Sequence, residues 1–262
     1  MEIKIFSLFP EMFEGPLGSS LIGKAQEKDI LHIDVINFRE YSTNKHKSVD
    51  DYPFGGGAGM VLQPEPIVSA LRDNLDLDAP DTEVILMSPQ GKPFTQEAAC
   101  ALAQKKQLAF VCGHYEGFDE RIFNWVDEKL SIGDYVLTGG EMPALIIMDA
   151  VSRFIPGVLG KLASAEEDSF STGMLEYPQY TRPVDFEGLV VPEVLRNGNH
   201  ALIATWRRKK SLKATYRLRP DLLSQEVIDA IHGKVPRDMK KAEKKFYAEV
   251  REELAQEDNE GE

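Results

Sequence analysis

The sequence has few of the features that mark several common classes of protein. Cys100 and Cys112 are its two cysteines in 262 residues; they form no CxxC pair and are too few for a disulfide framework. No apolar run approaches the roughly 18 residues that a membrane-spanning helix needs. The N-terminus has only a short apolar stretch and no cleavage-site pattern, so it does not resemble a signal peptide. These absences predict a cytoplasmic protein with neither a membrane span nor a structural zinc site.

Positive charge is also scarce over most of the chain. Lys and Arg number 30 against 43 Asp and Glu, which gives a net charge of −13. This balance argues against general nucleic-acid binding, because neutralising phosphates requires basic side chains. The exception is the segment 207–219, RRKKSLKATYRLR, which contains seven basic residues and no acidic ones. A basic segment on an acidic protein is a candidate docking surface.

Several signatures of common enzyme classes are missing. No GxGxxG motif follows the first predicted strand, so a Rossmann-type nicotinamide or methyl-donor site has little support. The run Gly55–Gly59 has four glycines in five positions but lacks the Gly-Lys-Ser/Thr ending of a P-loop. We therefore expect this run to permit close backbone approach to a ligand or partner, not to bind a nucleoside triphosphate. No GxSxG motif is present, and the five histidines show no paired metal-ligand spacing.

Two glycine-centred loops stand at the centre of the chain, Cys112–Gly117 and Ile132–Glu141. Each follows an apolar run that predicts a buried strand, and each leads into a predicted helix. Glycines at strand ends let the backbone come close to a ligand, so that main-chain N–H and C=O groups can bind it. The two loops together indicate one small-molecule pocket. The alternative, tight turns in an α/β sheet, explains one such loop more easily than both.

The order of predicted elements indicates a fold class. Strands are predicted at 2–8, 31–38, 83–87 and 108–112, and helices at 64–75, 118–126 and 141–154, with a loop of Ser88 to Gly91 after the third strand. Strands that alternate with helices predict an α/β domain with a mostly parallel sheet, here residues 1–159. Residues 160–174, GKLASAEEDSFSTGM, lack periodicity and predict a flexible interdomain linker.

The last third of the chain has a different pattern. Helices are predicted at 199–217, 221–231 and 236–254, so residues 175–250 form a small helical domain. The first of these helices is expected to turn Leu202, Ile203, Trp206 and Leu212 inward and its basic side chains outward. Residues 251–262 predict a disordered acidic tail.

Two charged residues are candidates for catalysis beside the predicted pocket. Asp168 lies on the predicted linker, and an acid on a mobile segment suits a general base that is assembled when substrate binds. Arg153 ends the apolar helix that follows the second loop. Considered alone, Asp168 is better explained as a solvated linker residue, and Arg153 as a cation that interacts with the last carbonyls of its helix.

The motifs match a known family over most of the chain. In order they are SLFPEMF, YPFGGGAGM, LMSPQG, FVCGHYEGFDER, SIGDYVLTGGEMPA, VSRFIPGVLG, EEDSF, YTRP and NGNHA. With these segments the sequence resembles the bacterial tRNA (guanine-N1)-methyltransferases, which modify guanine 37 next to the anticodon and so support maintenance of the reading frame. The nearest alternatives are another knotted RNA methyltransferase and a catalytically inactive RNA-binding factor with the same fold.

The resemblance implies a trefoil-knotted (SPOUT) α/β domain that binds S-adenosylmethionine, in a homodimer whose active site is shared between subunits. The implied donor-binding positions are Ser88, Pro89, Gly113, Tyr115, Glu116, Gly117, Ile132, Gly133, Asp134, Tyr135, Val136, Leu137, Gly139, Gly140 and Pro143. Asp168 is then the general base and Arg153 holds O6 of guanine. The family is also associated with Mg2+, for which the sequence shows no ligand cluster.

The predicted tRNA contacts come from the basic segment: Arg207, Arg208, Lys209, Lys210 and Lys213. Two positions depart from the family pattern. His114 stands where relatives often carry Arg, and Gln179 stands where they often carry His, so neither is assigned a role in substrate binding.

Overall fold

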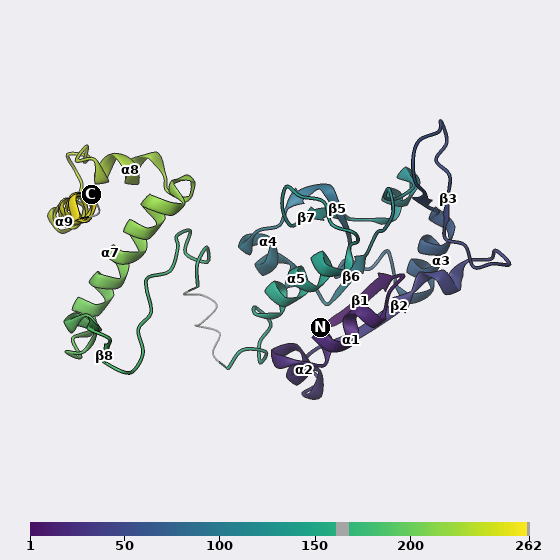
Figure 1. Cartoon of the computed structure of the whole chain (residues 1–262), viewed down its shortest axis with the longest axis horizontal. Coiled ribbons are helices and arrows are strands. Elements are labelled where there is room, and N and C mark those ends of the chain that lie inside the picture. Colours follow the sequence, from purple (N-terminus) through teal and green to yellow (C-terminus); the bar gives the residue numbers. More distant parts are fainter. Residues whose placement is uncertain (161–167, 261–262) are drawn as a thin grey trace. The chain divides into compact units, whose positions relative to one another are not determined.

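The computed structural model describes residues 1–160 and 168–260, which belong to two compact units, Met1–Ala165 and Glu166–Glu262 (Figure 1). The seven residues between these ranges include most of the acidic part of the predicted linker. Each unit has its own hydrophobic core, as expected of a separately folding domain.

The first unit is built on a five-stranded sheet in which every pairing is parallel. Its strands are β1 (Glu2–Ser7), β2 (His32–Asn37), β5 (Thr82–Pro93), β6 (Gln107–Val111) and β7 (Glu128–Ser131), in the order β2-β1-β6-β5-β7. A separate antiparallel pair consists of β3 (Asp50–Asp51) and β4 (Val61–Leu62). The predicted α/β class with a parallel sheet is confirmed.

Helices cover both faces of this sheet, which is why its central strands are almost continuously apolar. One face packs against α1 (Glu11–Leu17), α2 (Ser20–Glu27), α4 (Gln96–Leu102) and α5 (Glu141–Ser152). The other face packs against α3 (Pro64–Asn74) and the 3-10 helices η1 (Phe38–Tyr41) and η2 (Glu120–Trp125). Successive residues alternate between the faces, so Ile5 belongs to the first core and Phe6 to the second.

Two predicted elements of the first unit differ from the structure. The helix predicted at 118–126 is the 3-10 helix η2, whose N-cap Asp119 accepts a hydrogen bond from the Arg121 amide. The strand predicted to end at Met87 continues to Pro93, because Met87 and Lys92 both pair with Leu130 and the four residues between them form a bulge. A bulge of this kind directs side chains out of the sheet without ending the strand pairing.

The second unit is mainly helical, which confirms the predicted class of the C-terminal part. Its elements are the hairpin β8 (Asp185–Phe186) and β9 (Leu189–Val190), the 3-10 helices η3 (Glu193–Leu195) and η4 (Pro220–Leu222), and the helices α7 (His200–Leu218), α8 (Gln225–Ile231) and α9 (Lys241–Glu260). Leu212 of α7, Ile231 of α8 and Val250 of α9 meet in its core.

The C-terminal tail differs most from prediction. Residues 251–260 are not disordered but continue α9, and Leu254 is buried in the core. Three acidic side chains of this segment, Glu253, Glu257 and Asp258, instead form ion pairs with α7, which a sequence pattern alone does not show. Leu202, predicted to face inward, is 52% exposed. Residues 161–167 of the predicted linker lie outside the described residues, while Phe170 and Met174 close a hydrogen-bonded turn (Phe170 N to Met174 O, 2.7 Å).

Candidate active site

A pocket of about 380 Å³ lies at the carboxyl ends of β5, β6 and β7. This is the edge of a parallel sheet at which α/β proteins bind ligands, and the volume is in the range of small-molecule sites. Its walls are formed by the bulge in β5, the loop after β6, the loop after β7 and the first turn of α5. All the predicted donor-binding positions except Asp134 are brought together in the lining of this pocket. They are residues 88–89, 113, 115–117, 132–133, 135–137, 139–140 and 143.

Glycines bring these loops within backbone contact of each other. The amide of Gly140 donates to the carbonyl of Gly113 at 2.9 Å, which joins the two central loops directly. A Cβ at Gly140 would lie 2.7 Å from the Cα of Cys112. A Cβ at Gly91 would lie 2.5 Å from the carbonyl carbon of Leu130, beside the bulge. Both contacts are too short for any side chain, so glycine is required at these crossings of the chain.

A buried carboxylate lies behind the glycine loops. Glu141, the first residue of α5, is 1% exposed; it accepts a 2.6 Å hydrogen bond from Ser7 Oγ and lies 2.8 Å from His114 Nε2. The positive end of the helix dipole at the start of α5 also favours this charge. Phe9 packs on the His114 ring, with 4.6 Å between ring centroids. The side chain of His114 is therefore fixed, and it lines the pocket.

The neighbouring Cys112 is not a reactive thiol. Burial, with a smaller contribution from the charge of Glu141, raises the pKa of Cys112 well above its ordinary value. A thiol of this kind stays protonated, and the thiolate is the nucleophilic form. Cys112 is therefore not a candidate nucleophile, although it lies next to the pocket.

The glycine run Gly55–Gly59 and the residues after it lie against the first central loop, outside the pocket lining. Met60 O accepts from the Glu116 amide at 3.0 Å, and Leu62 N donates to Gly117 O at 2.9 Å. A Cβ at Gly59 would overlap the Glu116 side chain. The close approach was expected toward a ligand or partner, and the one that the structure shows is to the first central loop of the same chain. Phe54 at the edge of the run is fully exposed.

The lining also includes residues that sequence reasoning did not assign to the pocket. They are Met87, Gln90, His114, Phe118, Glu120, Phe123, Leu130, Ser131 and Thr138. Most of them lie next to predicted positions, so contiguity along the loops could have indicated them. Phe123 could not have been found in this way, because η2 brings it to the pocket from outside both loops.

The two predicted catalytic residues belong to different units. Arg153 is the half-buried C-cap residue of α5 in the first unit. Asp168 is half-buried at the start of the second unit, where its carbonyl accepts from the Ser171 amide at 3.2 Å. Gln179, the second departure from the family pattern, is exposed and donates to the Glu176 carboxylate.

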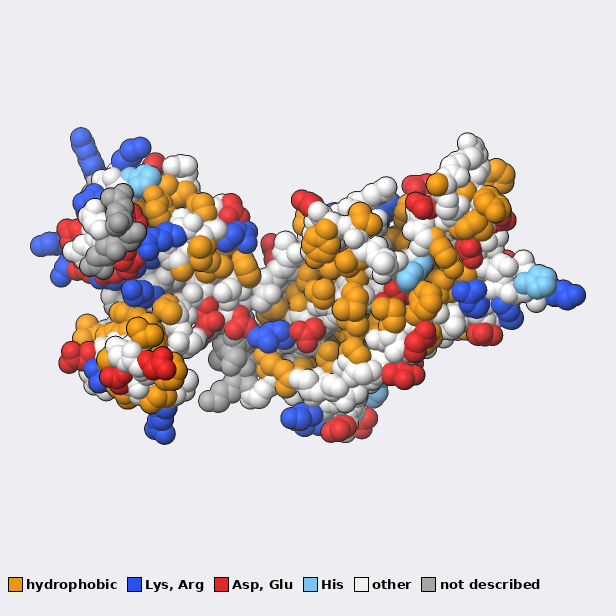
Figure 2. All heavy atoms as spheres, in the orientation of Figure 1, with side chains coloured by type: hydrophobic (Ala, Val, Ile, Leu, Met, Phe, Trp, Pro, Cys, Tyr) orange, Lys and Arg blue, Asp and Glu red, His pale blue; other side chains and the backbone are white. Residues whose placement is uncertain are grey.

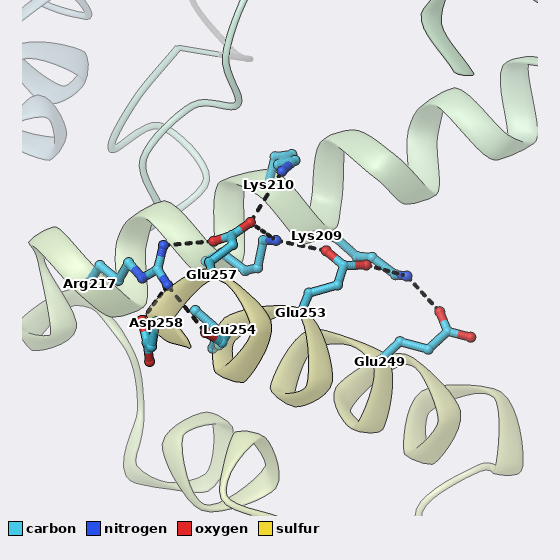
Figure 3. A network of polar contacts seen from close by, with 9 residues as sticks. Lys209, Lys210, Arg217, Glu249, Glu253, Leu254, Glu257 and Asp258 are labelled. Carbon is cyan, nitrogen blue, oxygen red and sulfur yellow. Dashed lines mark hydrogen bonds and ion pairs between the residues drawn. The ribbon is translucent and has the colours of Figure 1, made fainter. Parts of the chain in front are cut away.

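The basic face of α7 is not free, contrary to prediction (Figure 3). Lys213 is 4% exposed and pairs with Glu253 at 2.7 Å and Glu257 at 2.6 Å. Lys209 pairs with Glu249 at 2.6 Å and Glu253 at 3.0 Å. The prediction that these side chains point outward is wrong, because acidic residues four apart on α9 form a stripe that covers them.

Burial would lower the pKa of Lys213, but the hydrogen bonds that it donates to the Glu253 and Glu257 carboxylates raise this pKa above its ordinary value. The same two effects shift the pKa of Glu253 in the directions opposite to those for Lys213. Burial would raise its pKa, and the bonds from Lys213 and Lys209 bring it below the ordinary value. Both partners are therefore charged at neutral pH.

Comparison with known proteins identifies the family. The family model described as tRNA (guanine-1)-methyltransferase TrmD matches residues 1–225. The chain belongs to this family. Proteins named tRNA (guanine-N(1)-)-methyltransferase from Bacillus subtilis (strain 168), Bacillus cereus (strain G9842) and Lacticaseibacillus paracasei are 59%, 54% and 53% identical to it. These matches cover 85%, 97% and 96% of this chain and 92%, 100% and 98% of the relatives.

The matched range of the family model includes the whole pocket, Arg153, Asp168 and α7, and it ends at the start of α8. None of the helices in residues 1–160 and 168–260 has the length and apolar character needed to cross a lipid bilayer. Within the same ranges, no group of three or more His, Cys, Asp or Glu side chains could hold a metal ion. The predicted association with Mg2+ therefore has no site among the described residues.

Proposed function

We propose that this family member transfers a methyl group from S-adenosylmethionine to N1 of guanine 37 in tRNA and so supports reading-frame maintenance. The observation that carries the proposal is the pocket at the carboxyl ends of β5, β6 and β7, whose walls are the loops predicted to bind the donor. The location proposed for this activity is the cytoplasm, where tRNA is used.

The pocket residues suit S-adenosylmethionine in size and chemistry. The half-buried Gly117, Gly133 and Gly139 bring the backbone to the lining of a cavity of about 380 Å³, so adenine and the amino-acid group can be recognised by backbone hydrogen bonds. When bound, S-adenosylmethionine supplies the methyl group on a sulfonium, which is a good leaving group. The close crossing of the two loops at Gly113 and Gly140 also supports the proposed trefoil knot.

Guanine requires a base before it can accept a methyl group, because its N1 carries a proton. We assign this proton transfer to the Asp168 carboxylate. As the proton leaves, negative charge develops at O6, and the Arg153 guanidinium is assigned to stabilise it. This division of roles uses one charged side chain from each unit.

A second copy of the chain is part of the proposal. Met12 of α1, Leu21 of α2, and Met142 and Ile146 of α5 are all between 37% and 51% exposed. Figure 2 shows hydrophobic side chains gathered over this part of the first unit. The same helix α5 carries Pro143 of the pocket and Arg153 at its end. A homodimer formed through this face would bury these side chains and place a second copy beside the active site.

The target base must leave the stacked anticodon loop to reach the pocket, at a cost of a few kcal/mol. Contacts between cations of the second unit and tRNA phosphates offset this cost and set the register, while contacts to the Watson–Crick edge provide the selectivity for guanine. Arg207, Arg208, Lys209, Lys210 and Lys213 are the cations that the sequence predicts for this role.

Methyl transfer from labelled S-adenosylmethionine to paired tRNA transcripts tests the proposal directly. The transcripts differ only in carrying guanine or adenine at position 37. Label confined to the guanine transcript and recovered as 1-methylguanosine is the expected result. Equal labelling of both transcripts would move the target to another nucleotide, and no labelling of either would favour a non-catalytic RNA-binding role.

A further inference from the structure

Six of the seven cations in the segment 207–219 are paired with carboxylates of the second unit. Arg208 pairs with Glu243, Lys209 with Glu249 and Glu253, Lys210 with Glu257, Lys213 with Glu253 and Glu257, Arg217 with Glu257 and Asp258, and Arg219 with Asp221. The guanidinium of Arg207 lies over the Tyr177 ring, 4.5 Å from its centroid. Phosphates that bound here would have to displace these carboxylates, so the most basic segment of the sequence is a poor docking surface for RNA.

A second group of cations lies where α9 begins. We name it the α9 entry patch, and it consists of Arg237, Lys240, Lys241, Lys244 and Lys245. All are exposed except the half-buried Lys244. Figure 2 shows Lys and Arg side chains projecting from the second unit near the connection between α8 and α9.

Little negative charge opposes this patch. Among the described residues, the side chains of Arg237, Lys240 and Lys241 form no ion pair or hydrogen bond. Lys245 lies 3.6 Å from Glu249, which Lys209 holds more closely. The acids within the stretch are Asp238 and Glu243.

Glu243 is itself engaged by a bidentate hydrogen bond from Arg208, at 3.0 and 2.9 Å. These bonds from Arg208 lower the pKa of Glu243 despite its partial burial, with a smaller contribution from the charge of Lys240 in the patch. The patch therefore keeps a local excess of accessible positive charge on an otherwise acidic chain.

The backbone of the patch is held in place. Val235 and Met239 pack against the core of the second unit. Lys244 Nζ donates to the Arg237 carbonyl at 2.9 Å, and this bond closes the turn before α9. Lys241 is the first residue of α9, so its charge adds to the positive end of the helix dipole, where phosphates are favoured. Cations on a fixed backbone lose less conformational entropy on binding than cations on a mobile segment.

We propose that the α9 entry patch docks the phosphate backbone of the tRNA. The proposal rests on the proposed function, since it names the surface that this activity would use. Helix α9 then has two parts: its first turn binds RNA, and the acidic stripe that follows neutralises α7 and holds the unit together. The family model ends at residue 225, so this surface lies outside the range that it matches.

The test compares tRNA binding by two double variants of the full-length chain across a range of salt concentrations. Lys240→Ala/Lys241→Ala removes two cations from the patch. Its control is Lys28→Ala/Lys106→Ala, which removes two exposed cations just before β2 and β6, at the edge of the sheet opposite the pocket. The patch variant is expected to bind tRNA at least about tenfold more weakly at physiological salt. Its log–log salt slope should be shallower by about 1–2, since each lost phosphate contact removes a little under one unit.

The remaining readouts separate this proposal from the proposed function. In the patch variant, KM for tRNA is expected to rise while kcat and the calorimetric affinity for S-adenosylmethionine stay unchanged. If the patch variant had the tRNA affinity and salt slope of the wild type, the proposal that this patch docks tRNA would be wrong. The patch would then be a candidate surface for another acidic partner. A wild-type chain that binds tRNA but transfers no methyl group would overturn the proposed function, while the comparison of salt slopes would still decide the docking surface.

Discussion

The half-buried His114 and the buried Glu141 join the two central loops, with 2.8 Å between His114 Nε2 and Glu141 Oε2. The second carboxylate oxygen of Glu141 accepts from Ser7 at the end of β1. One carboxylate thus connects the ends of β1 and β6 to the first turn of α5. Because α5 and the loop after β6 form two walls of the pocket, the shape of the pocket depends on this connection.

Replacing Glu141 tests this dependence. Glu141→Gln keeps the shape of the side chain but weakens two charge-assisted hydrogen bonds. We expect the free energy of unfolding to fall by about 1–3 kcal/mol and the affinity for S-adenosylmethionine to fall with it. Urea unfolding monitored by Trp125 fluorescence, in a Trp206→Phe background that removes the other tryptophan, measures the first effect, and donor calorimetry measures the second.

Glu128→Gln is the matched control for Glu141→Gln. Its carboxylate is 24% exposed and pairs with the exposed Lys92 at 3.1 Å, so the expected change is below about 1 kcal/mol. Equal unfolding curves for the two variants would show that the contact between His114 and Glu141 has no structural role.

The crossing at Gly140 gives the second prediction. In Gly140→Ala the added methyl group would meet the backbone of Cys112 and Gly113, which cannot move without shifting the loop after β6. We expect an overpacking cost of about 1–3 kcal/mol and loss of detectable donor binding. Gly15→Ala in α1 is the control, because no atom lies within 4 Å of the new Cβ. Normal calorimetric affinity in Gly140→Ala would refute the assignment of this crossing to the donor site.

The pocket was predictable from sequence because its walls are continuous loops. The glycines at the ends of predicted strands indicated the two central loops, and the structure places both around one cavity. The bulge after Met87 was not predictable, since it depends on the pairing of β5 with β7. The ion pairs of α7 were missed for a similar reason: Lys213 and its partner Glu257 are 44 positions apart, and the acidic segment alone has the composition of a disordered tail.

The assignment of Asp168 gives the third prediction. Asp168→Asn removes the proposed base but keeps a side chain of the same size. We expect methyl transfer to tRNA to fall by at least about 100-fold, as for the loss of a general base, with the calorimetric affinity for S-adenosylmethionine unchanged. Glu193→Gln removes an exposed carboxylate from the same unit and is the control. Turnover near the wild-type rate in Asp168→Asn would assign the proton transfer to another group.

The ion pairs between α7 and α9 predict how the stability of the second unit depends on pH. The pKa values of Glu249, Glu253 and Glu257 lie below their ordinary value of 4.5. A carboxyl group with a lowered pKa in the folded state stabilises the fold above its unfolded pKa, and this stabilisation is lost as pH falls through the folded value. The second unit should therefore be at its most stable near neutral pH and lose stability progressively below about pH 4.5.

The lysines of these ion pairs contribute to stability with the opposite dependence on pH. The pKa of Lys209 and that of Lys213 are raised above the ordinary value of 10.5. Their stabilisation is present below that value and is lost only as pH rises through the folded pKa. The acid side of the profile is therefore the accessible test of the network.

Trp206 on α7 reports on this unit, and Trp125→Phe removes the only other tryptophan in the sequence. In that background, Glu253→Gln is expected to lower the free energy of unfolding by about 0.5–1 kcal/mol at pH 7. The same substitution should flatten the fall of stability between pH 5 and about pH 3, because one of the titrating groups is gone. If the free energy of unfolding fell equally steeply with pH below pH 5 in the presence and absence of Glu253, the acidic stripe would not be what holds α9 against α7.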